Sequence, residues 1–377
     1  MFFSRHPDSK LILLLELQSS IVRGSLVLMH PTSDTTPAGA TEVLFAESHT
    51  IEYRPDATSE YYIKTSLDTV TAAVDTALRN LSILAQDNPV PKKVDEVHFV
   101  LSSPWVISQA KTVSMQFDKD TPITPDRVHK ILSDERAEVS LGAKTETVTI
   151  EEKVFDVRLN GYSISDWKGK SARTLDVSYA LSVSSAESIA NLKHAVAHIV
   201  SGKNVSVHSS LLLQYISLRL AAIPGDTCML VHAHGELTDM VVIRHGMCSF
   251  FGSYPIGINT IIRTLGEMTN RSPQAAESVL SLYLGHHMDG PEETRAGMAV
   301  EAVTGSWTNE LLGLAGAIRV AGDTTAFMPP HIFIIAHAHG DLFEAALKKV
   351  FPQSVIGTLS VDMTRTFTSA IASIERK

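Results

Sequence analysis

The sequence predicts an α/β fold made of two similar halves, and three observations lead to this prediction. The chain has 377 residues, which is too long for one small domain and suits two halves. Segments patterned as strands alternate with segments whose apolar residues recur at helical spacing, as is typical of α/β proteins. Each half also opens on two strands joined by a short polar turn, which indicates a duplicated architecture.

The first half is predicted to begin with a hairpin, a third strand and a helix. Apolar runs at 11–15 and 21–29 flank a short polar segment, a pattern that predicts two paired strands. Alternation over 43–51 predicts the third strand, and apolar residues at helical spacing predict a helix over 67–84. Two prolines within 87–93 exclude helix and predict a linker.

A strand-rich unit is predicted for the middle of the chain. Thr124 followed by Pro125 predicts a helix start, because a hydroxyl caps the first turn and proline suits the first helical position. The predicted strands occupy 94–101, 106–117 and much of 148–183, and an amphipathic helix follows over 185–200. Trp105, Tyr162 and Trp167 have two interpretations here, an exposed partner face or the core of the unit, and the core is favoured.

The second half is predicted to repeat the alternation of strands and helices. Helices are expected at 210–222, 256–268, 273–284, 301–318 and 341–350, and strands at 228–231, 239–243, 332–335 and, more weakly, 355–361.

Composition excludes several classes of protein. Lys plus Arg number 32 and Asp plus Glu 41, which leaves a net charge of −9 and excludes binding to nucleic acid or anionic lipid by charge alone. The two cysteines, Cys228 and Cys248, are too few for a disulfide framework and indicate a reducing cytoplasm. No signal peptide and no apolar run of about 18–20 residues is present, so membrane contact is expected only through a partner.

One sequence motif occurs twice: His-Ala-His-Gly followed by an acidic residue and leucine, at 232–237 and at 337–342. Each copy follows the end of a predicted strand. A His-x-His pair on an extended segment places both rings on one face, and neutral imidazole is a ligand for zinc and similar ions.

Several segments together resemble the actin-like ATPases, in particular the cell-division protein FtsA and the pilus-assembly protein PilM. The segment 230–243 occupies the place of the family's second phosphate loop, and 335–342 resembles its adenosine loop. The N-terminal hairpin resembles the first phosphate loop, and the helix start at 272–277 also matches. The resemblance covers nearly the whole chain and implies an actin-like fold, a duplicated ribonuclease H-like architecture with an FtsA-type inserted subdomain.

The resemblance also implies how the chain is divided. Residues 1–93 would form the first part of the first half, and 94–200 the inserted subdomain with its return helix. Residues 201–340 would form the second half, and 341–377 would return to the first. ATP and Mg would bind between the halves, at the positions that correspond to the family's loops: Glu16, Ser19, Ser20, Gly235, Thr238, Asp239 and Gly340.

The departures from the family pattern all concern these loops. Loop glycines let a phosphate approach backbone N–H groups without a side chain in the way. Here Glu16 and Gln18 replace the first loop's aspartate and glycine, and Glu236 would add negative charge beside the phosphates. Histidines occupy further aspartate or glycine positions: His232, His234, His337 and His339. These replacements favour an altered or lost ATP site.

The four histidines have two interpretations. An actin-like fold would place both loops at one cleft, where the histidines would bind zinc or a similar metal, with Glu16, Glu236 or Asp239 as carboxylate ligands. Alternatively the imidazoles hydrogen-bond within the cleft, and this second interpretation is favoured.

The leading functional hypothesis is a cytoplasmic scaffold without a dedicated enzymatic role. It would join a membrane division, pilus or secretion complex through protein contacts, with possible self-association and with the inserted subdomain as the docking face that the resemblance implies. The chain's last residues, 366–377, carry a short apolar face that is weak as a membrane helix. The alternatives are an ATPase that changes the angle between its halves, and a metal-binding protein.

Overall fold

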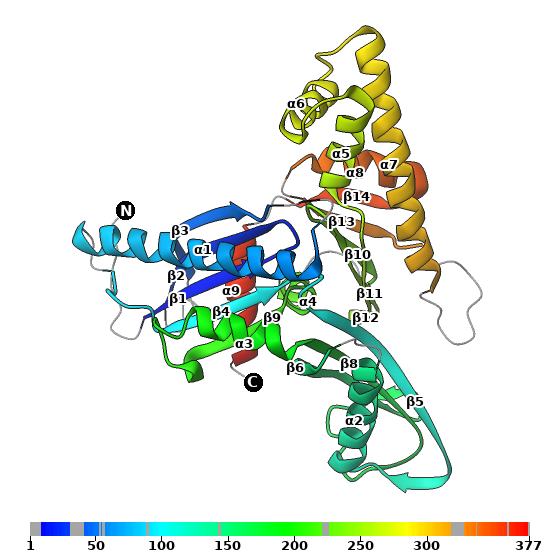
Figure 1. The fold of residues 1–377 in the computed structure, drawn as a ribbon. Helices are drawn as coiled ribbons and strands as arrows, with labels where there is room; N and C mark the ends of the chain where they lie inside the picture. The colour runs from blue at the N-terminus through cyan, green and yellow to red at the C-terminus, as the bar shows by residue number, and fades with distance from the viewer. Residues whose placement is uncertain are drawn as a thin grey trace. The chain divides into compact units, whose positions relative to one another are not determined.

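A computed structural model describes residues 9–30, 41–52, 54, 57–87, 90–141, 145–220, 226–317, 328–336, 338–359 and 362–375. The chain divides into two compact units (Figure 1). Unit 1 contains Met1–Pro224, Met247–Ser249 and Asp362–Lys377, and unit 2 contains Gly225–Gly246 and Phe250–Val361.

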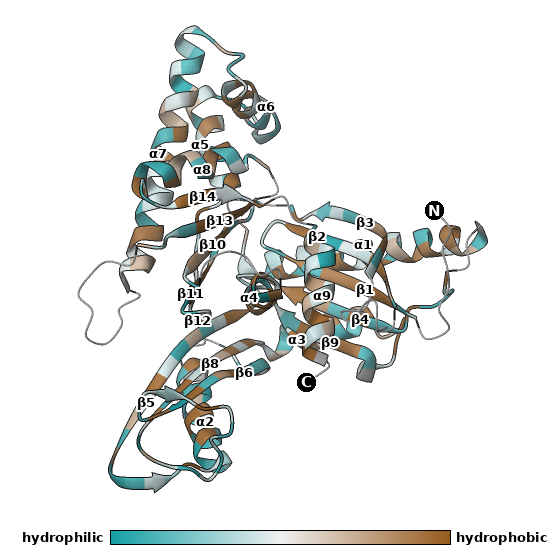
Figure 2. Cartoon of the chain, turned by 180° about the vertical axis from the view of Figure 1, so that it is seen from behind, coloured by the Kyte–Doolittle hydropathy of each residue, from teal (hydrophilic) through white to brown (hydrophobic). Residues whose placement is uncertain are grey.

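Unit 1 is built on a five-stranded sheet of order β3-β2-β1-β4-β9. The predicted hairpin is present: β1 pairs antiparallel with β2, and β2 with β3. β4 and β9 continue the sheet in parallel, which requires crossover connections. In chain order, β1, β2, β3, β4 and β9 span Lys10–Leu17, Ile21–Met29, Thr41–Thr50, Glu96–Leu101 and Val205–Ser209. The central strand β1 is hydrophobic along nearly its whole length (Figure 2), as burial on both faces requires.

Helices cover both faces of this sheet. α1 (Ser59–Asp87) and α3 (Ala186–Ala195) pack on the face that holds Leu11, Leu13 and Leu15. α9 (Met363–Glu375) lies on the opposite face, as Figures 1 and 2 show from the two sides. α4 (Ser210–Leu220) follows β9 directly and packs against α9.

The inserted subdomain of unit 1 is a four-stranded antiparallel sheet of order β5-β8-β6-β7 with one helix, α2 (Pro125–Leu141). Thr124 caps that helix as predicted, because its hydroxyl accepts the Arg127 N–H at 3.3 Å. The turn at Asn160-Gly161 has positive φ at both residues, which suits a tight hairpin. In chain order, β5, β6, β7 and β8 span Ile107–Pro122, Thr147–Leu159, Tyr162–Ser163 and Ser171–Ser185.

The aromatic residues of this region do not share one role. Trp105 is 9% exposed and belongs to the core around α1, and Trp167 packs partly buried against the core of the inserted subdomain. Tyr162 is 74% exposed. The favoured interpretation, the core of the strand-rich unit, therefore holds for Trp167; Trp105 is buried in the core of the first sheet instead, and Tyr162 lies on the surface.

Unit 2 repeats the plan of the first sheet. Its order is β12-β11-β10-β13-β14, with an antiparallel hairpin β10–β11 and parallel pairs β10–β13 and β13–β14. In chain order, β10, β11, β12, β13 and β14 span Cys228–Ala233, Thr238–Arg244, Met247–Tyr254, His331–Ala336 and Val355–Thr358. The core contains Trp307, Phe343 and Phe351, and its helices α5, α6, α7 and α8 span Ile258–Thr269, Pro273–Leu284, Gly290–Ala317 and Gly340–Val350.

The structure differs from the predicted organisation at particular elements. β4 pairs with β1, so the strand predicted at 94–101 belongs to the first sheet and the inserted sheet begins at β5. α8 and β14 belong to unit 2, so the returning segment is α9 rather than all of 341–377. The short polar strand β9 and the strand β12 were not predicted, because their alternation of apolar residues is weak. Within the described residues, no helix is long and apolar enough to span a bilayer.

Candidate functional site

The hairpin turn between β10 and β11 holds most of the predicted residues of unit 2. The backbone N–H of His234 donates to the Leu237 carbonyl at 2.8 Å, which closes a tight turn. The strand register places His232 opposite Asp239 and Ala233 opposite Thr238. The first His-Ala-His copy begins within β10, which extends to Ala233 and so is longer than the predicted strand, whereas β13 ends at Ala336, directly before the second copy. The two strand ends are neighbours, because Ala233 pairs with Ala336 in the parallel pair β10–β13.

His234 and Asp239 form a fully buried pair. His234 Nε2 lies 3.0 Å from Asp239 Oδ2, and both side chains are 0% exposed. Ser253 Oγ donates to the other oxygen, Oδ1, at 2.5 Å. The His232 ring packs on the His234 ring with centroids 3.9 Å apart. Asp239 thus orients a histidine and a serine inside unit 2.

Thr238 has a similar internal role. Its hydroxyl donates to the Ile256 carbonyl at 2.7 Å and accepts the indole N–H of Trp307 at 2.8 Å. Both Thr238 and Trp307 are 0% exposed. The hydroxyl therefore links β11 to the start of α5 and to the middle of α7.

The turn packs closely against the N-terminus of α5. The carbonyls of His234 and Gly235 accept the N–H groups of Ile258 at 3.1 Å and Asn259 at 2.8 Å. A Cβ on Gly257 would lie 2.4 Å from the Gly235 oxygen, so only glycine permits this approach. N–H groups at a helix N-terminus would otherwise suit an anion.

The Glu236 side chain, in the same turn, is held against α5. Its carboxylate accepts the amide N–H of Asn259 at 2.8 Å and pairs with Arg263 at 2.8 Å. The charge that would repel phosphate is therefore compensated locally by a cation and a helix N-terminus.

The loop between β13 and α8 contains the second His-Ala-His copy. His339 has φ 56°, in the left-handed region, and precedes α8 without a side-chain cap. Gly340 starts α8, where a Cβ would lie 2.9 Å from Thr358 Cγ2. His337 lies outside the described residues. Among the residues that are described, no group of three His, Cys, Asp or Glu side chains is arranged to hold a metal ion.

The predicted residues of unit 1 lie at the β1–β2 turn. The indole N–H of Trp105 donates to the Gln18 carbonyl at 3.0 Å, and the Tyr62 hydroxyl donates to the Ser19 carbonyl. The two aromatic rings are stacked, with centroids 5.6 Å apart. The Ser20 carbonyl accepts the Ile51 N–H at 2.8 Å. Neither aromatic was predicted to contact this turn, because they come from other parts of the chain.

Glu16 is buried on the α9 side of the first sheet. Its Oε1 accepts from the Thr364 hydroxyl at 3.2 Å, and Oε2 has no hydrogen-bond partner among the described residues. Burial raises the pKa of Glu16 to about 7, against the opposing charge of Arg23. Magnesium takes ionised carboxylates and water as ligands, so an ion at this position would have to displace the proton that burial favours on Glu16.

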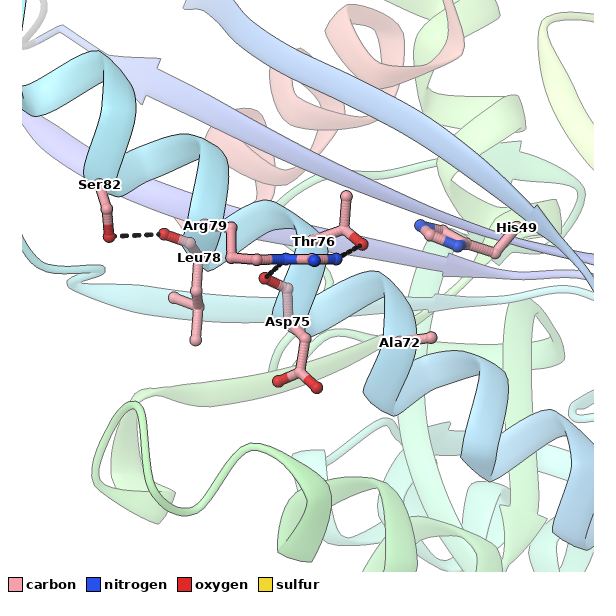
Figure 3. Close-up of a pocket in the computed structure, with 7 residues that line it drawn as sticks. All are labelled: His49, Ala72, Asp75, Thr76, Leu78, Arg79 and Ser82. Atoms are coloured by element: carbon pink, nitrogen blue, oxygen red, sulfur yellow. Dashed lines mark hydrogen bonds between the residues drawn. The ribbon is translucent and has the colours of Figure 1, made fainter.

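A surface pocket that the sequence analysis did not predict lies between α1 and β3 (Figure 3). It encloses about 710 Å³. His49 comes from β3 and the other lining residues from α1, among them Arg79, which donates to the Thr76 hydroxyl at 3.1 Å. Arg79 and Asp75 are exposed, so the pocket is an open groove along the surface of α1.

Comparison with solved structures identifies the fold. The structure matches that of the PilM–PilN type IV pilus biogenesis complex over 97% of this chain and 98% of that chain, with a TM-score of 0.58 and 15% sequence identity. This likeness confirms the predicted actin-like fold, in a form that resembles PilM.

Other actin-like structures match at lower scores. A non-polymerisable quadruple mutant of pCBH ParM is 11% identical over 98% of this chain and 100% of that chain, with a TM-score of 0.44. The ethanolamine utilization protein EutJ from Carboxydothermus hydrogenoformans is 11% identical over 99% of this chain and 92% of that chain, with a TM-score of 0.43. No protein-family model matches the sequence. No curated protein matches it either.

Proposed function

We propose that this chain is a cytoplasmic actin-like adaptor that couples a membrane-bound pilus, secretion or division complex to the cell interior through protein contacts. In this proposal the ATP site is altered so that Mg-ATP no longer binds as a cofactor. The partner would be a membrane protein, and contact with the membrane would be indirect.

The observation that carries the proposal is the internal use of Thr238 and Asp239. These two residues, which the family resemblance places at the nucleotide, are 0% exposed and hydrogen-bonded within unit 2. Full engagement of a side chain by protein partners leaves it poorly suited to bind a ligand that comes and goes. The full-length likeness to PilM supports the pilus assignment within the adaptor class.

Nucleotide binding separates the adaptor from an ATP-driven switch. Ligand that binds the folded state raises its melting temperature by mass action. We expect Mg-ATP and Mg-ADP at millimolar concentration to leave the melting curve of the full chain unchanged, while a known actin-like ATPase measured in parallel shifts. A rise that disappears without magnesium would support the switch instead.

A membrane fractionation tests the mode of coupling. We expect the full chain to sediment with membranes from its own host and to be released by a wash that strips peripheral proteins. We also expect no binding to protein-free vesicles with about 30% anionic lipid, because the chain carries a net charge of −9. Binding to bare vesicles would contradict an indirect membrane contact, and absence from the membrane fraction would contradict the adaptor itself.

Zinc analysis tests the remaining alternative. The four-histidine site stays a prediction, because it depends on His337. Stoichiometric zinc in the purified chain, lost in a His232→Ala and His337→Ala double variant, would establish it. We expect near-zero zinc in both proteins.

A further inference from the structure

Two buried histidines of unit 1 meet where the inserted sheet reaches the first sheet. His98 lies on β4 and His208 on the neighbouring parallel strand β9. Their side chains lie on the face opposite α1, with exposed fractions of 1% and 8%. The ring planes are nearly parallel, at 11°, with centroids 5.3 Å apart. Neither histidine belongs to the loops described above.

The two rings form the centre of a chain of polar contacts. His98 Nδ1 lies 3.1 Å from His208 Nε2. At the outer ends, His98 Nε2 lies 3.4 Å from Glu96 Oε2, and His208 Nδ1 lies 3.0 Å from Glu151 Oε1. All four ring nitrogens are therefore engaged, two with carboxylates and two with each other.

Both carboxylates have a further partner besides the histidines. The hydrogen bond with His98 and the cation of Lys10, whose Nζ lies 2.6 Å from Glu96, lower the pKa of Glu96 to about 2 against the effect of burial. Glu151 Oε2 accepts the backbone N–H of Ser209 at 2.9 Å, directly before α4 begins. A helix N-terminus favours negative charge.

Proton counting then selects one state of the pair. An ionised carboxylate only accepts, so His98 Nε2 and His208 Nδ1 must each carry a proton. With those two protons alone, both rings are neutral and their lone pairs face each other at 3.1 Å. With four protons, two N–H groups face each other instead. Three protons satisfy all the contacts, and the pair then carries one positive charge between two carboxylates.

The other charged groups near the histidine pair do not supply the positive charge between Glu96 and Glu151. Asp95 accepts the backbone N–H of Leu11 at 2.8 Å. Glu152, the neighbour of Glu151 on β6, pairs with Arg136 of α2 at 3.4 Å. α4 carries one charged residue, Arg219, in its last turn. Lys10 Nζ contacts Oε1 of Glu96, whereas His98 contacts Oε2, and the Lys10 side chain is half-exposed.

We propose that His98 and His208 hold one shared proton that locks the inserted subdomain to the first sheet. Glu151 belongs to β6 of the inserted sheet, whereas His98 and His208 belong to the first sheet. Loss of the shared proton at high pH places two lone pairs in contact. Gain of a fourth proton at low pH places two N–H groups in contact. Loss of the shared proton also removes the positive charge opposite Glu151, which weakens the contact of β6 with β9, so the attachment of the inserted subdomain weakens as the pH rises.

Histidine-ring NMR of the ¹⁵N-labelled full chain tests the proton count directly. We expect three ring protons on this pair at neutral pH, with a cross-ring correlation between His98 Nδ1 and His208 Nε2. Two neutral rings with independent titrations would overturn the proposal. This measurement uses the unchanged protein and does not depend on how a variant folds.

Hydrogen exchange tests the lock itself. The probes are peptides covering 147–159 and 205–212, compared at about pH 7 and about pH 9 after correction for intrinsic exchange. We expect protection in wild type to fall by about tenfold at the higher pH, the size of one lost hydrogen bond. His208→Gln should lose the protection at both pH values, and the exposed control His129→Gln should behave as wild type. Equal protection of wild type at both pH values, or of His208→Gln and wild type, would refute the lock.

Discussion

His234 Nε2 and Asp239 Oδ2 lie 3.0 Å apart in the interior of unit 2, with neither side chain exposed. The two residues stand at the two ends of one hairpin turn, five positions apart. The family resemblance assigns a glycine to the first position and a nucleotide-binding aspartate to the second. In this chain the histidine that replaces the glycine gives the retained aspartate a buried partner.

Removal of Asp239 should destabilise unit 2. Asp239→Ala leaves His234 Nε2 and Ser253 Oγ without the acceptor that they share, and breaking a buried charge-assisted pair costs roughly 3–5 kcal/mol. Urea unfolding followed by the fluorescence of Trp307, which lies in unit 2, measures this cost. Glu277→Ala removes an exposed carboxylate from the middle of α6 in the same unit and should be near neutral. An equally small effect of both variants would contradict the structural role of Asp239.

Thr238 should respond more strongly to loss of its hydroxyl than to loss of its methyl group. Thr238→Val leaves the Trp307 indole N–H and the Ile256 carbonyl unsatisfied, at about 1–3 kcal/mol for each buried group. Thr238→Ser keeps both hydrogen bonds and loses one methyl group, at about 1 kcal/mol. We expect the urea midpoint to fall in the order wild type, Thr238→Ser, Thr238→Val. A valine variant as stable as the serine variant would show that the hydroxyl is dispensable to the fold.

Two glycines of unit 2 should respond oppositely to alanine. Gly257→Ala places a Cβ 2.5 Å from the His234 carbonyl oxygen, which forces the turn away from α5 and lowers the melting temperature. Gly305→Ala, inside α7, meets no atom within 4 Å and should stabilise by about 1 kcal/mol through helix propensity. Differential scanning calorimetry compares the two. A neutral Gly257→Ala would mean that the turn is not held against α5.

Glu16 should make stability depend on pH in a definite direction. Its pKa is raised by burial from 4.5 to about 7, so the folded state binds a proton that the unfolded state has released between these values. Stability therefore falls as the pH rises from about 4.5 to about 7, by about 3 kcal/mol, and then levels off. Glu16→Gln removes this loss and should be the more stable protein at pH 8.

The matched control for Glu16 is Glu187→Gln, which removes an exposed carboxyl of unit 1. Urea unfolding at several pH values, followed by the fluorescence of Trp105, reports on unit 1. If wild type and Glu16→Gln show parallel pH profiles, the carboxyl of Glu16 is not protonated on folding.

Local patterns predicted most of the elements, and distant contacts account for the differences. The hairpin strands, α6 and the capped start of α2 were predicted closely, because alternation and caps are properties of neighbouring residues. α1 begins at Ser59, ahead of the predicted 67, and its first turns are held by Tyr62, which stacks on Trp105. That contact joins residues 43 positions apart and has no local signal.

The chemistry of the loops was predicted only in part. The sequence showed that His234 and Glu236 replace glycines, and so that the second loop differs from a phosphate loop. The Arg263 partner of Glu236 and the Ser253 partner of Asp239 lie on other elements, and no spacing rule connects them. The pairing of His98 with His208 is more distant still, because a parallel sheet brings together strands 110 residues apart.

The sequence by itself determined the class of fold, the duplicated plan, the acidic balance and the loss of glycine from the phosphate loops, because each depends on residue type and local order. Only the tertiary structure decided what the replaced residues do. Asp239, Thr238 and Glu16 are all buried, and a buried polar group must find a partner within the protein or change its protonation. Which partner it finds depends on strands and helices that meet only in the folded chain.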